Sequence, residues 1–121
     1  MIKFICAVGL FVGALSPLVA GDALIKTVEA VHKESAALKG QQVSIKGEVV
    51  KVNNGVMKRN FLHIQDGTGD ASNNDLVVTS RQDTAKVGDH VTVIGTVVLD
   101  TDFGFGYNYP LLVENSSIKV K

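Results

Sequence analysis

Four aromatic residues stand at alternate positions of the segment DFGFGYNYP, residues 102–110: Phe103, Phe105, Tyr107 and Tyr109. In an extended strand, alternate side chains project from one face, so the four rings would form a surface on which nucleic-acid bases stack. The alternative is a structural hairpin, in which the intervening glycines permit a tight or bulged turn and the rings cover one end of the fold. We favour the hairpin, because large rings are more often buried than exposed. The direction of the four rings therefore decides whether they contact a ligand.

A second set of candidate binding residues lies on and around the segment NFLHIQD, residues 60–66. The outward face of this strand would carry Phe61, His63 and Gln65, and the strand after it would add Val77, Thr79 and Arg81. Lys58 and Arg59 would stand at the mouth of this face. Rings stack on bases and cations hold phosphates, so the set suits single-stranded nucleic acid. The alternative, which we favour, is that Phe61 packs on the aromatic segment and the cations are solvated, because so few cations make a weak phosphate track.

Metal-binding signals are weak. The three histidines are far apart and lack the close spacing of metal ligands: His32, His63 and His90. Met57 and His63 could supply two ligands of a soft copper(I) site, which is too few to define one. The segment DGTGDASNND resembles a calcium loop, but Ala71 and Val77 stand where an EF-hand requires glycine and glutamate. We expect no metal and no cofactor, and a solvated turn at residues 66–75.

The sequence contains no complete catalytic motif. The chain has no G-x-S-x-G segment and no phosphate-binding P-loop. The sequence SSIK at residues 116–119 spells S-x-x-K but lacks the companion motifs of the enzymes that use it. We therefore expect a protein that is not an enzyme.

Residues 1–20 have the build of a secretory signal peptide, with Lys3 before an apolar run that ends in Ala20. The alternative is a retained membrane anchor, but the run is short for a bilayer span and has no cationic stop. Cleavage would remove Cys6, the single cysteine, and with it any disulfide or thiol chemistry. Loss of Lys3 would leave the mature chain one unit negative, so it has no strong general field for polyanions.

The remaining chain predicts one helix followed by five strands. In residues 21–40 an apolar stripe recurs at helical spacing, with Asp22 to cap the start and Gly40 to end the helix: Leu24, Val28, Val31 and Leu38. From residue 41 the apolar period changes to two, which predicts strands at 41–53, 60–66, 74–80, 89–100 and 109–121. Leu62 and Ile64 should point inward from the second strand.

Two of these strands are long and contain an internal glycine, Gly47 or Gly95, which indicates a bulge or a sharp bend. A bent strand can serve both halves of a barrel, so few strands suffice to close it and to bury both sheet edges. We therefore expect residues 41–121 to form a small closed barrel, with the helix covering an open end.

The pattern resembles an OB-fold, a five-stranded Greek-key barrel. The segments GVMKRNFLHIQDGTG and DFGFGYNY are similar to motifs of a group of small exported bacterial OB-fold proteins, usually described as nucleic-acid-binding-like. Lys58 and Phe61 depart from that pattern, which has glycine and tryptophan there. The resemblance implies a ligand across the second and third strands, flanked by the loops at residues 53–59 and 100–107, which should lie near each other.

These observations together predict a non-catalytic exported binding module, periplasmic or secreted, with no membrane contact after signal cleavage. The first ligand class to test is single-stranded nucleic acid or a related oligomeric anion. The alternative is a periplasmic accessory protein that binds a partner protein, a metal or haem.

Overall fold

A computed structural model describes residues 22–121, and the predicted signal peptide at residues 1–20 lies outside them. The elements follow one another as β1 (Leu24–Ile25), α1 (Val28–Lys33), α2 (Ser35–Leu38), β2 (Gln42–Val56), β3 (Arg59–Gln65), β4 (Leu76–Ser80), β5 (His90–Asp102) and β6 (Asn108–Val120). Neither helix is long and apolar enough to cross a membrane; this finding covers residues 22–121. All five predicted strands are present, and β1 is an addition to them.

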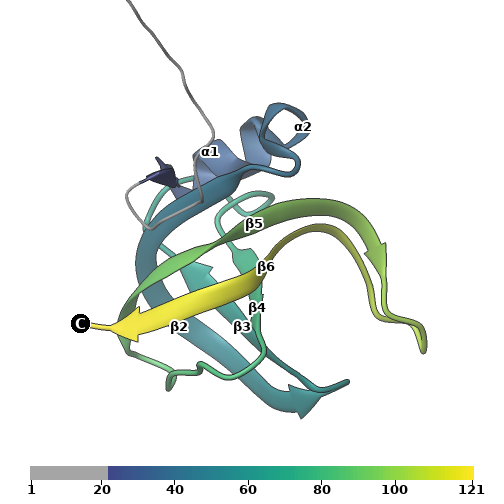
Figure 1. Ribbon diagram of the computed structural model, residues 1–121. Coiled ribbons are helices and arrows are strands. Elements are labelled where there is room, and N and C mark those ends of the chain that lie inside the picture. Colours follow the sequence, from purple (N-terminus) through teal and green to yellow (C-terminus); the bar gives the residue numbers. More distant parts are fainter. Residues whose placement is uncertain (1–21) are drawn as a thin grey trace, which may run out of the picture.

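The five long strands close into a barrel (Figure 1). The hydrogen-bonded order is β2, β3, β4, β6 and β5, and β5 pairs again with β2, so the sheet returns to its first strand. All pairings among these five strands are antiparallel except β4 with β6, which are parallel and joined through Val78 and Val113. The all-β barrel predicted from the sequence is therefore confirmed.

The predicted bend in the first long strand is confirmed. The strand β2 pairs with β5 as far as Glu48 and with β3 from Glu48 onward, so it changes partner directly after Gly47. A Cβ atom at Gly47 would lie 2.8 Å from the carbonyl oxygen of Gln65, a separation that real Cβ atoms do not show. Gly47 is therefore required because the backbone of β3 approaches it closely as β2 crosses from one half of the barrel to the other.

The interior of the barrel is one apolar cluster to which every long strand contributes. Leu62 and Ile64 are fully buried in it, as their alternation predicted. Val28, Val31 and Leu38 from the helices join the same cluster. The helices thus cover one end of the barrel, as expected, and Figure 1 shows α1 and α2 together at that end.

The single helix predicted over residues 21–40 is wrong in its extent. Leu24 and Ile25 instead form β1, which runs parallel to β2, and Leu24 is exposed rather than part of the buried stripe. The helix α1 begins only after Thr27, whose hydroxyl accepts a hydrogen bond from Ala30 N at 3.0 Å. The backbone at Glu34 leaves helical geometry and separates α1 from α2. Thr27, and not Asp22, is the helix cap.

Candidate functional site

The outer face of β3 and β4 is set by the register of the two strands. Phe61 lies opposite Thr79 and His63 lies opposite Val77, so these four side chains share a face. At one end this face is not an open binding surface, and the favoured alternative, that Phe61 packs on the aromatic segment, is confirmed. Phe61 is only 2% exposed and Thr79 is buried.

Two rings of the segment 102–110 cover Phe61. The Tyr109 ring stacks on Phe61 with centroids 5.6 Å apart and an interplanar angle of 28°. The Phe103 ring meets Phe61 edge-on, also at 5.6 Å, and Tyr109 at 6.0 Å. Three rings in mutual contact bury a large apolar area and gain further from the edge-to-face and offset geometry. Burial also raises the pKa of the Tyr109 hydroxyl above its ordinary value of 10.0.

The other two rings of the segment are exposed, because the chain turns back between them. The turn is closed by Phe103 N donating to Tyr107 O and Tyr107 N donating to Gly104 O, each at 2.9 Å. Phe105 stands at its apex with φ 55°, between two glycines that also have positive φ. Phe105 is 95% exposed and Tyr107 is 42% exposed. The favoured hairpin interpretation therefore describes Phe103 and Tyr109, while Phe105 and Tyr107 remain available to a ligand.

The β5–β6 hairpin and the β2–β3 hairpin contact each other, as expected for the loops that flank this face. The contact is made by Arg59, whose guanidinium carbon lies 4.9 Å from the centroid of the Phe103 ring. The Arg59 Nε also lies 3.3 Å from a carboxylate oxygen of Glu114, so part of its charge is neutralised inside the protein. Lys58 is exposed at the β2–β3 turn, where it and Met57 both have positive φ.

A network of polar side chains at the other end of the face centres on Asp75. His63 Nδ1 donates to the Asp75 carboxylate at 2.7 Å, and His32 Nε2 donates to the Asp75 carbonyl oxygen at 2.6 Å. The proton therefore lies on Nδ1 of His63 and on Nε2 of His32, because a carbonyl or an ionised carboxylate can only accept a hydrogen bond. A hollow of about 320 Å³ lies beside Asp75 and is lined also by His32, Val77 and Tyr109. The sequence did not indicate this network, because its members come from three distant segments with no characteristic spacing.

A metal site receives no geometric support in the part of the chain that the structure describes. No group of three or more His, Cys, Asp or Glu residues there could hold a metal ion. Met57 lies at the β2–β3 turn, and His63 is four residues along β3 from Arg59, roughly 13 Å further on. The two side chains considered for copper(I) are thus held apart by the length of the strand.

The comparisons with known proteins concern the fold. No protein-family model matches the chain, and no curated protein matches it in sequence. The structure is similar to two OBodies, each bound to hen egg-white lysozyme. The first has a TM-score of 0.50 and the second a TM-score of 0.51, each at 17% identity. Each match covers 69% of this chain, and it covers 84% of the first OBody and 82% of the second. A protein assigned as an aspartyl-tRNA synthetase from Leishmania major Friedlin gives a TM-score of 0.59 at 11% identity, over 90% of this chain and 23% of that one.

The barrel is an OB-fold. Identities this low support the fold alone, and the likeness extends over most of this chain.

Within the OB-fold, the structure brings Arg59, Phe61, Phe103 and Tyr109 into one cluster. Arg81 does not join them. Its Nε donates to the Asn115 side chain at 3.4 Å, and it lines a separate hollow with residues 80–83 and 115–117.

Proposed function

We propose that this chain is a non-catalytic exported binding module, and that it binds single-stranded nucleic acid or a related oligomeric anion. The ligand would run along the outer face of β3 and β4, between the β2–β3 and β5–β6 hairpins. Export follows from the expected signal peptide at residues 1–20, and the location is then the periplasm or the medium. The proposal builds on the OB-fold, whose ligands commonly lie across these two strands.

The observation that carries the proposal is the exposure of Phe105. The ring gains almost nothing from burial, and its left-handed backbone costs roughly 1 kcal/mol for a residue other than glycine. Stability therefore does not account for an aromatic residue at this position. A base stacked on an exposed ring is worth about 1–3 kcal/mol, and this is a gain that the free protein lacks.

The cations near the two hairpins set the electrostatic part of the affinity. Lys58 is free to contact a phosphate, Lys51 lies opposite His63 on the neighbouring strand, and Arg59 is partly neutralised by Glu114. Two to three phosphate contacts to a single strand predict that the affinity falls by roughly tenfold between 50 and 200 mM salt. The binding should thus depend on stacking more than on charge.

The test is a fluorescence-anisotropy titration with single-stranded oligonucleotides at low salt. Phe105→Ala combined with Tyr107→Ala should weaken binding by roughly tenfold or more, since each stacked base is worth 1–3 kcal/mol. Lys58→Ala with Arg59→Ala should weaken it as well. Ile25→Ala removes an apolar side chain on β1 that is nearly as exposed as Phe105, and it should leave the affinity unchanged. Absence of binding at high micromolar protein, or affinity unchanged by both pairs of substitutions, would reject the proposal.

A partner protein is the second candidate, and the same exposed ring favours it. Aromatic side chains on loops are frequent anchors of protein–protein interfaces, and the OBodies similar to this chain are described as bound to lysozyme. A pull-down with the wild-type protein and with Phe105→Ala would separate the two candidates. A specific partner that is lost in the variant, together with no oligonucleotide binding, would favour the accessory-protein role.

A further inference from the structure

A row of cationic side chains crosses the side of the barrel formed by β2, β5 and β6. Lys46 of β2 lies opposite Thr92 of β5, and Thr92 lies opposite Lys119 of β6. Direct cross-strand partners project from the same face of a sheet, with Cβ atoms roughly 5 Å apart. The two lysines therefore flank one threonine on a common face, about 10 Å from each other.

The neighbouring row of residues shows that this face points outward. Ile45, Val93 and Ile118 are cross-strand partners in the adjacent row, and all three are buried in the core. Because successive residues of a strand point to opposite faces, the row of Lys46, Thr92 and Lys119 must face the solvent.

The next outward row contains one acidic and one basic residue beside a histidine. Glu48 lies opposite His90, and the His90 carbonyl oxygen accepts a hydrogen bond from Lys121 N at 2.8 Å. These residues surround a hollow of about 390 Å³, here called the lysine hollow, whose polar lining is Lys46, His90, Thr92, Lys119 and Lys121. Gly47 also lines it and contributes no side chain to fill it.

The lysines of the lysine hollow differ from several other basic residues of this protein because they form no ion pair within the described part of the chain. Among residues 22–121, the ion pairs of lysine and arginine involve Lys26, Lys33 and Arg59, and none involves a lysine of the hollow. The chain as a whole has twelve basic and twelve acidic residues, whereas Lys46, Lys119 and Lys121 outnumber Glu48 on this face, so positive charge is in local excess here. A bound anion would therefore meet lysine ammonium groups that no ion pair of the described residues neutralises.

We propose that the lysine hollow binds a soluble oligophosphate, held by Lys46, Lys119 and Lys121 with a hydrogen bond from the Thr92 hydroxyl. Lysine ammonium groups bind phosphate as point charges and do not require bidentate geometry, which suits three flexible side chains around one hollow. The concave shape favours a compact soluble anion over a flat membrane surface. The hollow lies on β2, β5 and β6, away from the outer face of β3 and β4, and the inference does not depend on the proposed function of that face.

The test is isothermal titration of the protein with inorganic tripolyphosphate at low salt. Saturable binding of one tripolyphosphate per chain is expected, with affinity reduced about tenfold or more by Lys46→Gln combined with Lys119→Gln. The matched control is Lys39→Gln with Lys86→Gln, which removes two exposed lysines that do not line the hollow. The control should bind as the wild type does. Circular dichroism checks that each variant is folded.

Three results would overturn the inference. The first is an absence of saturable binding, and the second is an equal loss of affinity in the control variant. The third is binding to vesicles of phosphatidylglycerol that exceeds binding to tripolyphosphate and is lost with Lys46 and Lys119, because the surface would then be a membrane contact. Lys58→Ala with Arg59→Ala should leave tripolyphosphate binding unchanged, so this experiment and the oligonucleotide titration can fail independently.

Discussion

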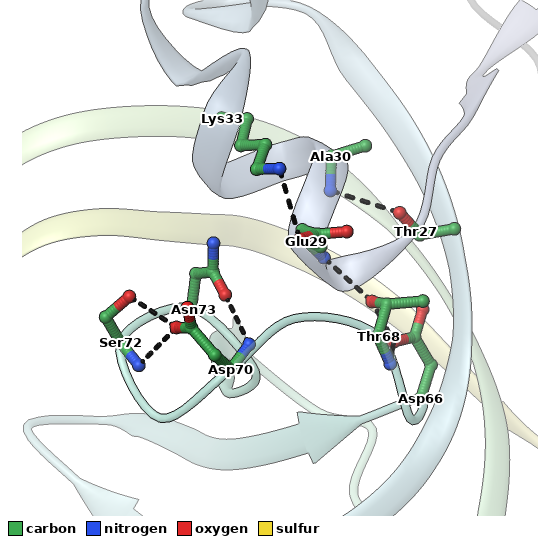
Figure 2. A network of polar contacts seen from close by, with 9 residues as sticks. All are labelled: Thr27, Glu29, Ala30, Lys33, Asp66, Thr68, Asp70, Ser72 and Asn73. Carbon is green, nitrogen blue, oxygen red and sulfur yellow. Dashed lines mark hydrogen bonds and ion pairs between the residues drawn. The ribbon is translucent and has the colours of Figure 1, made fainter.

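The carboxylate of Asp66 joins the β3–β4 connection to the first turn of α1, and we predict that it stabilises the whole domain. Asp66 Oδ2 accepts a hydrogen bond from Val28 N at 2.9 Å. Thr68 Oγ1 accepts one from Glu29 N at 3.0 Å, as Figure 2 shows. With Thr27 bonded to Ala30 N, the first three amides of the helix are all satisfied by side chains. The segment at 66–69 is therefore a helix cap rather than the solvated turn expected from the sequence.

The magnitude follows from the loss of one charged acceptor at a helix N-terminus. Loss of a capping side chain costs roughly 0.5–2 kcal/mol, and Asp66 also accepts hydrogen bonds from the amide and hydroxyl of Thr68. We expect Asp66→Ala to lower the free energy of unfolding by about 1–2 kcal/mol. For a domain of this size, the melting temperature should fall by roughly 5–10 °C. Asp66→Asn keeps an acceptor and loses the charge, so about half of that loss is expected.

The stability that the Asp66 carboxylate contributes should decrease as the pH falls. Burial alone would raise the pKa of the Asp66 carboxyl, but the hydrogen bonds from Thr68 and from Val28 N outweigh it and hold the pKa below 3.8. A carboxylate with a lowered folded-state pKa contributes stability that is fully present above its unfolded pKa and is lost as the pH falls through the folded pKa. The difference between wild type and Asp66→Asn should therefore be largest near neutral pH and shrink below about pH 4.

Urea denaturation followed by circular dichroism, at about pH 7 and about pH 3, measures both effects. The control is Glu48→Gln, which removes an exposed carboxylate that is not a helix cap. The reasoning is refuted if Asp66→Ala unfolds at the same urea concentration as wild type. It is also refuted if the difference between wild type and Asp66→Asn is the same at both pH values.

Three further predictions concern two aromatic residues and Gly95 of β5. Phe61→Ala should lower the free energy of unfolding by about 3–5 kcal/mol, since it empties the centre of the cluster; a loss below about 1 kcal/mol would show that the cluster adds little. Phe105→Ala should change it by less than about 0.5 kcal/mol, because the ring is exposed, and a large loss would contradict that exposure. Gly95→Ala should cost about 1–3 kcal/mol, because the new methyl group would lie 2.8 Å from the carbonyl oxygen of Glu114. Thermal melting of each variant measures these changes, and a melting temperature of Gly95→Ala equal to that of wild type would count against the close approach.

The barrel could be predicted from the sequence because its signals are local and consistent. Apolar residues at alternate positions identified the strands, and Gly47 and Gly95 marked two places where a side chain would meet a neighbouring backbone. The inward direction of Leu62 and Ile64 followed from the same alternation. The start of the helix could not be predicted in this way, because Leu24 fits a helical stripe and a strand equally well. Its pairing with β2 makes it part of a strand.

The site was less predictable because it depends on contacts between distant segments. The alternation in β3 placed Phe61 on the outer face correctly, and its expected packing on the aromatic segment is confirmed, but the sequence did not show that only Phe103 and Tyr109 make this contact. The glycines indicated the turn, but the sequence did not show that Phe105 would stand at its apex with positive φ and be exposed. Asp75 connects His32 and His63 across intervals of about forty and twelve residues, and no short motif encodes such a meeting.

The junction of β4 with β6 has a consequence for the motion of the barrel. A single parallel bridge, Val78 with Val113, closes the sheet there, and Asp83 adds one bond from its side chain to Ile118 N at 2.9 Å. Every other pair of long strands shares a ladder of several residues. We expect the barrel to open first along this line, so that amide hydrogens on its two sides exchange with deuterium sooner than those of β2. Uniformly slow exchange across both would contradict this. If it holds, the domain behaves as a sheet that wraps around its core and has one weak seam between its ends.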